Sequence, residues 1–410
     1  MNRKHFGVLS KLAAVGALGM TSLVTLGTSA SSSAATSSFK ILAVIDTSGP
    51  VAIYGQQQLI ALHASVYYWN RHGGIDGHKI QMSYVNGNGD PATAETALIN
   101  WVSSNGKPNE IMDLESGVDD AGIPAEVKRL GVLDIGQDSA NACATNAPVN
   151  CPTRFVPVPT TATNMAATAA FFKSKGVTSV GLLNEEDGFS ESEVPILQAA
   201  LTKVGITSVV QSFAATAVDV TPEMQSLKSA GVGAIWGAAL GPSAAYIANA
   251  RFNLGMTIPL AFDAGAGAQD LTSIIPAAQL TNVFESVGRP QVAAVPEPGR
   301  TDLYASAVAD GFNPKLPFGG MNEPLPVSIV WDSFVLMRDA AAQAKSIKTS
   351  AMVKALLSLN KTGQNDPLYM YANKMAFTKS IHQDVAATPA TYSLVPVAPL
   401  NAEGEVSASK

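Results

Sequence analysis

The spacing of apolar residues along the chain predicts alternating strands and helices. Residues 41–45 form a short aliphatic run, which fits a strand that is buried on both faces. Polar turn residues follow this run. Leu59, Leu62, Val66 and Trp69 then recur at intervals of three and four, so they share one face of a helix. The order of the two segments predicts a strand that leads into an amphipathic helix.

The next segments complete a strand–helix–strand unit. Gly73 and Gly74 are expected to end the helix, because glycine readily adopts the left-handed conformation found just past a helix end. Ile80, Met82 and Tyr84 then alternate with other residues, as the positions on one face of a strand do. Strands that are joined through a helix should pair in parallel, with a right-handed crossover.

The same rhythm recurs along most of the chain. Asp90 and Pro91 are suited to begin a helix, and the proline-containing segment 155–159 is predicted to cross between two strand–helix series. Further strands are predicted at residues 111–114, 132–135, 180–183, 208–213, 234–236, 259–262, 283–287 and 374–377, and a long helix is predicted at 327–344. Two such series predict an α/β protein with a parallel sheet in each of two lobes.

The first 35 residues have the features of a signal peptide. Basic residues precede an apolar stretch at 12–26, and small residues follow it, with cleavage expected after Ala30 or Ala35. The stretch is too short and too rich in glycine for a transmembrane helix, so we expect export to the periplasm or the medium rather than an uncleaved anchor. No cysteine lies at the end of this leader, so we expect neither a lipid anchor nor membrane insertion of the mature chain.

The amino-acid composition and the net charge limit the classes of molecule that the protein is expected to bind. The 410 residues are long for one core, and 47 % hydrophobic with 14 % charged residues is typical of a globular protein. The formal net charge is −6, and loss of the basic leader would make the mature chain more acidic. An acidic chain without basic runs argues against binding to nucleic acid or to anionic membranes.

The chain contains two cysteines, Cys143 and Cys151. An even number of cysteines in an exported protein predicts a disulfide, and the alternative is a pair of free thiols.

Signatures of catalysis and of metal binding are absent from the sequence. It contains no GxSxG elbow, no HExxH, no phosphate-binding Walker loop and no GxGxxG after a strand. His72 and His78 flank a turn, which fits an exposed pair better than a metal site. The acidic runs 119–120 and 185–187 lack the alternating spacing of a calcium loop and are typical of solvated helix starts. We therefore expect a binding protein without a cofactor or a metal.

In open parallel sheets, ligands bind beyond the carboxyl ends of the strands. Loops at this position begin where an apolar strand stops and small or polar residues start, and they comprise residues 46–54, 115–119, 136–139, 184–189 and 263–265. Backbone N–H groups at the helix starts in such loops can bind an anion. For each single residue the alternative is an ordinary role in a loop or in the core.

An ordered set of short motifs resembles the start of the leucine/isoleucine/valine-binding protein family, the extracytoplasmic receptors of ABC importers. The set comprises Ser48-Gly49-Pro50, Tyr54-Gly55, Asn70, Gly73-Gly74-Ile75-Asp76-Gly77 and the stretch from Asn86 to Asp90-Pro91. A weaker likeness extends over residues 39–380. The resemblance implies a type I periplasmic binding protein: two Rossmann-like lobes joined by a three-strand hinge, with crossings near Pro159, Gly288 and Pro367. The first lobe would comprise residues 39–159 and 288–367, and the second 160–287 and 368–400.

The resemblance also implies roles for particular residues. The turn Ser116-Gly117 would hold a ligand carboxylate, with Gly117 in place of a hydroxyl residue, and Asp138-Ser139 would contribute from the next loop. Phe189 would cover the ligand and Tyr54 would close from the first lobe, while Asp263 lies in the last of the strand-end loops. The acidic residue that receives an α-ammonium in the family falls near Ala217, so the sequence departs from the family pattern there. Asp219, two residues further on, is the alternative position for this acid.

These observations favour a monomeric, exported solute-binding protein of an ABC importer, with no enzymatic activity. It would capture a small polar solute, such as an amino acid or an amide, and present it to a permease and an ATPase encoded as separate chains. One alternative is a ligand-sensing regulator with the same fold. Another is a secreted α/β hydrolase, although the sequence has no nucleophile elbow.

Overall fold

The structure is a computed structural model. It describes residues 37–49, 51–115, 122–137, 142–239, 242–263, 265, 270–292, 298–313, 321, 324–359, 366–371, 374–386 and 388–400. The predicted leader lies outside these residues. Within the described part of the chain, no helix is both long enough and apolar enough to cross a membrane.

The first lobe is built on parallel strands. Its strands are β1 (Phe39–Ile45), β2 (Ile80–Asn86), β3 (Glu110–Asp113), β4 (Asp134–Ile135), β5 (Arg154–Pro159) and β11 (Gln383–Asp384). β1 pairs with β2 on one side and β3 on the other, and β5 pairs with β4 and β11 in the same way. A parallel bridge between Glu110 and Leu133 joins the two groups. The predicted strand–helix–strand unit at the start of the chain is therefore confirmed.

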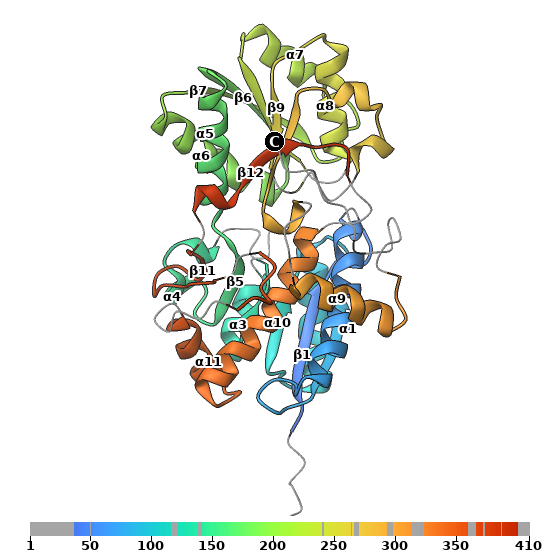
Figure 1. The fold of residues 1–410 in the computed structure, drawn as a ribbon, viewed down its shortest axis with the longest axis vertical. Coiled ribbons are helices and arrows are strands. Elements are labelled where there is room, and N and C mark those ends of the chain that lie inside the picture. Colours follow the sequence, from blue (N-terminus) through green and yellow to red (C-terminus); the bar gives the residue numbers. More distant parts are fainter. Residues whose placement is uncertain are drawn as a thin grey trace, which may run out of the picture. The chain divides into compact units, whose positions relative to one another are not determined.

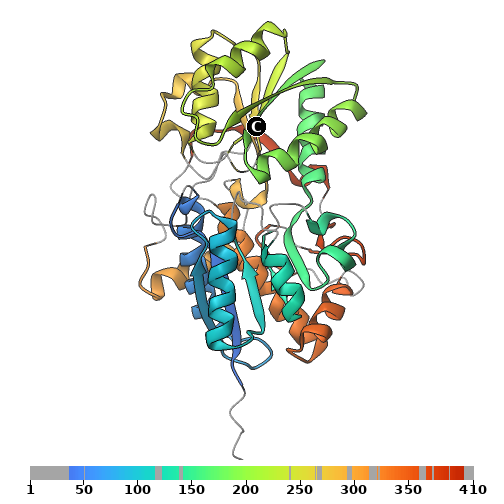
Figure 2. The ribbon, with the colours of Figure 1, turned by 180° about the vertical axis from the view of Figure 1, so that it is seen from behind.

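Helices cover both faces of this sheet. They are α1 (Ala52–Arg71), α2 (Pro91–Asn105), α3 (Gly122–Leu130), α4 (Ala147–Asn150), α9 (Pro298–Ala309), α10 (Pro324–Ala344) and α11 (Thr349–Leu356). Ile41 and Ala43 of β1 pack in one core cluster with residues of α1 and α10, whereas Leu42 and Val44 pack with α2 and α3. Figures 1 and 2 show these two helical layers from opposite sides. Successive side chains of a strand point to opposite faces, which explains why the run is apolar throughout.

The second lobe repeats the arrangement. Its strands are β6 (Ser179–Glu186), β7 (Thr207–Ala214), β8 (Ala234–Ala238), β9 (Leu260–Phe262), β10 (Val283–Val287) and β12 (Ser393–Pro396), in the order β12-β10-β9-β8-β6-β7. β12 runs antiparallel to β10, and the other pairs are parallel. The helices are α5 (Thr161–Ser174), α6 (Gly188–Lys203), α7 (Thr221–Ser229) and α8 (Ser243–Asn253). Short 3-10 helices are η1 (Ala142–Ala144), η3 (Leu271–Ser273), η4 (Ala277–Leu280), η5 (Arg289–Gln291) and η6 (Pro389–Thr391).

The core of the second lobe also lies on both faces of its sheet. Trp236 of β8 packs in a cluster with residues of α5 and α6, whereas its neighbour Ile235 packs with residues of α7 and α8. The two sheets with their helices give the predicted α/β fold of two lobes (Figure 1).

The chain passes between the two sheets after β5, after β10 and between β11 and β12. The first two passages follow Pro159 and Val287, the last residues of β5 and β10. The third was expected near Pro367, a division that would put residues 383–384 in the second lobe. β11 pairs with β5 instead, so the chain leaves the first sheet only after residue 384.

The C-terminal third differs most from the prediction. Residues 374–377 were predicted as a strand, but they form none. Ala376 instead donates its N–H to the Asp384 carboxylate at 2.9 Å and accepts from the Val385 N–H at 2.9 Å. The sequence did not predict β11, β12 or α9. These elements are short or contain proline, so the spacing of their apolar residues shows no clear period. Asp90 does cap α2, accepting from the Thr93 N–H at 2.8 Å as expected.

Candidate functional site

The carboxyl ends of β1 and β2 are held together by a network of polar side chains. Asn86 accepts from the Thr47 N–H at 2.9 Å, and its amide donates to the Ser48 hydroxyl at 2.6 Å. Buried Asp46 accepts from the Gly89 N–H at 2.8 Å. The network fixes the turn that precedes α1 and therefore the position of the residues at the start of that helix.

Tyr54 is placed by the first turn of α1. The neighbouring Gly55 lies directly against the backbone of Asp46, where a Cβ would be 2.1 Å from the Asp46 carbonyl oxygen. Only glycine permits this approach. The contact brings the buried Tyr54 ring to the carboxyl end of β1.

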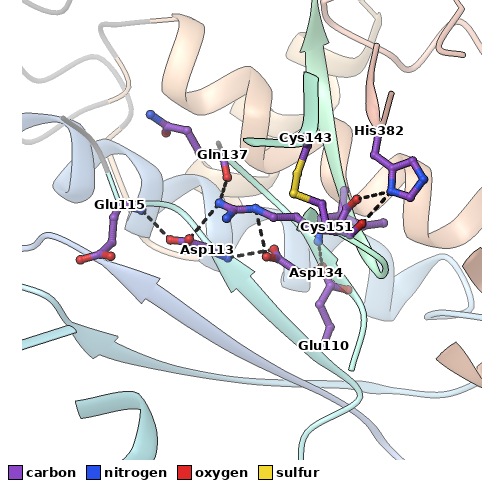
Figure 3. Close-up of polar contacts among 10 residues, drawn as sticks. Glu110, Asp113, Glu115, Asp134, Gln137, Cys143, Cys151 and His382 are labelled. Carbon is purple, nitrogen blue, oxygen red and sulfur yellow. Dashed lines mark hydrogen bonds and ion pairs between the residues drawn. A yellow bond between two sulfur atoms is a disulfide. The ribbon is translucent and has the colours of Figure 1, made fainter. Parts of the chain in front are cut away.

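A buried guanidinium lies at the carboxyl ends of β3 and β4. Arg154 Nη2 lies 2.9 Å from the Asp113 carboxylate, and its Nε lies 3.2 Å from Asp134. Arg154 also donates to the Gln137 carbonyl oxygen (Figure 3). The three charged side chains are at most 2 % exposed. Removal of one partner from such a group would leave a buried charge uncompensated.

Glu110 lies beside this group on β3 (Figure 3). Burial and, to a smaller extent, the negative charge of Asp134 raise the pKa of the Glu110 carboxyl well above its usual value. The Ile135 N–H, which donates to Glu110 at 3.3 Å, opposes the shift. The raised pKa favours the neutral form of Glu110, which adds no further negative charge to the group around Arg154.

The predicted disulfide between Cys143 and Cys151 is confirmed, with the two Cα atoms 5.5 Å apart. The bridge closes a loop that lies against β11 (Figure 3). The His382 N–H donates to the Cys143 carbonyl at 2.9 Å, and His382 Nδ1 lies 2.8 Å from the Cys151 carbonyl oxygen. Burial lowers the pKa of His382, and its neutral ring stacks on Phe155 at 4.3 Å. The disulfide loop thus fixes the segment that precedes the third passage between the sheets.

In the second lobe, acidic residues gather at the carboxyl ends of β6 and β9. Asp187 caps α6, accepting from the Ser190 N–H at 2.8 Å and from its hydroxyl at 2.7 Å. Asp263 follows β9 directly and accepts from the Gly265 N–H at 3.2 Å. Glu193 faces the same region from the buried side of α6. Glu185, the last member of this acidic group, is a buried residue of β6.

A hydrogen bond joins the two lobes at this acidic group. The Tyr54 hydroxyl donates to the Gly265 carbonyl oxygen at 2.8 Å. The N–H of the same Gly265 bonds Asp263. A residue of α1 in the first lobe and an acidic residue of the second lobe are thereby connected through one residue.

The structure brings together some of the residues that were predicted to bind a ligand. Tyr54 and Asp263 meet through Gly265. Phe189 is partly buried in the first turn of α6, two residues beyond Asp187. Ser116, Gly117, Asp138 and Ser139 lie outside the described residues.

Asp219, the alternative position for an ammonium-binding acid, has another role. It is exposed, and it accepts from the Thr221 N–H at 2.9 Å and from the Thr221 hydroxyl at 2.6 Å, at the start of α7. Asp263 and Glu193, by contrast, are buried acids of the same lobe.

Sequence reasoning missed Glu193 and Arg154. A signal for Glu193 existed, because it recurs with Ser190, Leu197 and Leu201 on the buried face of α6. A carboxylate at a core-facing position of a helix is unusual unless it has a functional or paired role. Arg154 gave no such signal, because its partners come from distant segments.

Comparison with known proteins identifies the fold. A family model described as periplasmic binding protein matches residues 38–386. No curated protein matches the sequence. A type 1 periplasmic binding protein from Bordetella pertussis Tohama I is similar in structure, with 20 % identity, a TM-score of 0.71, and coverage of 87 % of this chain and 96 % of that one.

Two branched-chain amino acid receptors are also similar. The leucine-binding protein LivK from Thermotoga maritima has 15 % identity and a TM-score of 0.67, covering 83 % of this chain and 91 % of that one. LivJ from Streptococcus pneumoniae, solved with isoleucine, has 16 % identity and a TM-score of 0.66, covering 85 % and 93 %. Because these sequence identities are low, the structural similarity establishes only the fold. The match to the family model establishes that the chain belongs to the family. The chain therefore belongs to the periplasmic binding protein family and is a solute-binding protein with the type I fold.

Proposed function

We propose that this protein captures a small polar solute between its two lobes and delivers it to a membrane permease of an ABC importer. The permease and its ATPase would be separate chains, and the receptor would act as an exported monomer. Membership of the periplasmic binding protein family supports solute binding outside the cytoplasm. The type I fold supports closure of two lobes about a hinge, which is a common response to ligand in such receptors.

A chain of two hydrogen bonds between the lobes indicates where the solute would bind. The Tyr54 hydroxyl of the first lobe bonds the Gly265 carbonyl of the second, and Gly265 bonds the buried Asp263. Elements of both lobes thus converge where an acidic residue follows a parallel strand. In open α/β sheets this end of the strands is where ligands bind.

The acidic side of this site favours a solute with a cationic or hydrogen-bond-donating group. Asp263 and Glu193 are buried and would interact most strongly with an ammonium or an amide N–H. The predicted Ser116-Gly117 turn and Ser139 would bind a carboxylate or a carbonyl group from the first lobe. A zwitterion, or a neutral amide with both a donor and an acceptor, satisfies both sides.

Two related structures contain ligands that carry a carboxylate. LivJ from Streptococcus pneumoniae was solved with isoleucine, and a solute-binding protein from Rhodopseudomonas palustris was solved with 4-hydroxybenzoate. Both compounds carry a carboxylate, and only isoleucine also carries an ammonium. For this chain, the acidic residues of the second lobe favour a ligand that carries both a carboxylate and an ammonium, as isoleucine does.

A thermal-shift screen tests the proposal. Purified mature protein is mixed with amino acids, amino acid amides, organic acids and sugars, and hits are measured by titration calorimetry. We expect stabilisation by amino acids or amides, since a ligand that binds only the folded state raises its stability. Asp263→Asn should weaken the best hit, whereas Glu191→Gln, at an exposed position of α6 outside the strand-end loops, should not. A screen in which only sugars stabilise the protein would contradict the proposed solute class.

Small-angle scattering tests closure, and a vesicle assay tests transport. The radius of gyration should fall when the hit saturates the protein. Uptake of that solute by vesicles that carry the candidate permease and ATPase should require this protein. Binding without any uptake would instead favour the ligand-sensing role.

A further inference from the structure

Two fully buried carboxyl groups of the second lobe have an oxygen without a hydrogen-bond partner among the described residues. These oxygens are Glu193 Oε2 and Asp263 Oδ1, and neither finds a donor among the described residues. The two residues are 3 % and 1 % exposed. Glu193 is on α6 and Asp263 follows β9, and they are close enough for the charge of Asp263 to act on Glu193. Buried polar atoms are normally satisfied, so the pair requires a partner beyond those that the described residues supply.

The surroundings of the pair are acidic or neutral. Asp187 faces it from the N-terminus of α6, and Glu185 faces it from β6. Tyr392, at the end of η6, faces Glu193 with a phenol group that also hydrogen-bonds with Tyr371. In the described part of the chain, no lysine, arginine or histidine forms an ion pair with Glu193, Asp187 or Asp263.

Buried carboxylates without a cation cannot all remain ionised at low cost. Burial, followed by the charges of Asp263 and Asp187, raises the pKa of Glu193 well above its usual value. Burial also raises the pKa of Asp263 to about 7, against the opposing hydrogen bond from Gly265. A proton or an external cation is needed to neutralise the pair.

We propose that Glu193 and Asp263 hold a proton between them when the site is empty, and that a cationic group of the solute displaces this proton on binding. The inference rests on the proposed solute-binding function and adds proton release to it. On binding, the O–H bond of the protonated carboxyl breaks and the proton leaves for bulk water. The two carboxylates then accept hydrogen bonds from the cationic group, and the charge of the pair falls by one as the solute brings in one positive charge.

The ligand-free protein gives the first test. Infrared spectra of the parent at pH 7 should contain the carbonyl band of a protonated carboxylic acid that is lost in Glu193→Gln. Subtraction of the two spectra removes any carboxylic acid band that comes from Glu110 or another group common to both proteins. Glu186→Gln is the matched control, because Glu186 is an exposed acid at the end of β6, and its spectrum should equal that of the parent. A parent spectrum that lacks the difference band would overturn the proposal.

Thermal unfolding of the same proteins gives a second test. A carboxyl with a raised pKa binds more protons in the folded state than in the unfolded state, so stability falls as pH rises from about 4 to above 7. The amides in Glu193→Gln and Asp263→Asn do not titrate. The Tm of each variant, relative to the parent, should therefore rise between pH 5 and pH 8, while Glu186→Gln should show no such trend. Parallel curves for the parent and both variants would overturn the inference.

Calorimetry tests the displacement with three matched probes. L-leucine carries both an ammonium and a carboxylate, L-leucinamide lacks the carboxylate, and 4-methylpentanoate lacks the ammonium. For the probes with an ammonium, the heat of binding should depend on the ionisation enthalpy of the buffer and show release of a proton near pH 6. Affinity should then fall by roughly tenfold per pH unit below that region.

A probe that binds through its ammonium without proton release would contradict the inference and leave the proposed function standing. Failure of the solute screen would contradict the proposed function, while the spectra and unfolding curves would still decide the protonation of the pair.

Discussion

The hydroxyl of Tyr54 lies 2.8 Å from the carbonyl oxygen of Gly265, although 210 residues separate them along the chain. This hydrogen bond joins α1 of the first lobe to the loop that follows β9 of the second. Because Gly265 also bonds Asp263, the contact between lobes is directly linked to the acidic group of the proposed site.

Tyr54→Phe should weaken solute binding without unfolding the protein. The change removes one hydroxyl and keeps the buried ring, so it should cost about 0.5–1.5 kcal/mol, the usual value of one hydrogen bond. This corresponds to a roughly two- to tenfold increase in Kd. Titration calorimetry with the best hit of the screen measures the change. Tyr84→Phe is the control, because Tyr84 is 44 % exposed on β2 and should leave Kd unchanged. Equal affinity of the Tyr54→Phe variant and the parent would show that the bond does not contribute to the bound state.

Arg154→Met should strongly destabilise the first lobe. The substitution leaves Asp113 and Asp134 buried without their cation, a change that typically costs about 3–5 kcal/mol. Urea unfolding measures the free energy of unfolding. The triple variant that also carries Asp113→Asn and Asp134→Asn should recover part of the loss, because the buried charges are then absent. If Arg154→Met alone unfolds at the same urea concentration as the parent, the ion-paired group does not stabilise the fold.

Removal of the disulfide should lower the stability of the protein. Cys143 and Cys151 close a loop with a sequence separation of eight, and on the chain-entropy model such a loop contributes roughly 2–3 kcal/mol. The variant Cys143→Ala/Cys151→Ala should lose this amount in urea unfolding. Free-thiol titration of the unfolded, unreduced parent should find no reactive thiol. Two reactive thiols in that titration would contradict the bridge.

Gly117→Val tests the predicted carboxylate-binding turn. A β-branched side chain at this position should block close approach of the backbone N–H groups to the ligand. We expect the affinity to fall more than tenfold, which corresponds to a loss above about 1.4 kcal/mol. Asp138→Asn should weaken a zwitterionic ligand more than a neutral one. Unchanged affinity of the Gly117→Val variant would show that the ligand carboxylate does not bind at this turn.

The sequence by itself determined the elements whose periodicity is strong. Residues 41–45, the larger part of β1, are apolar at every position, so a strand covered on both faces was predictable. Asp90 with Pro91 marked the start of α2. The even number of cysteines, in a chain that is expected to be exported, predicted the disulfide. These signals are local, because propensity, capping and alternation depend on residues a few positions apart.

The tertiary structure alone decided which distant residues meet. β11 has two residues, too few for a period, and its place beside β5 comes from pairing across the sheet. Arg154 neutralises Asp113 and Asp134, which belong to other strands. Glu193 is close to Asp263 only because α6 packs against β6 and β8 of the second sheet. Burial and the resulting loss of hydration set the charge state of such groups, and neither is defined until the chain has folded.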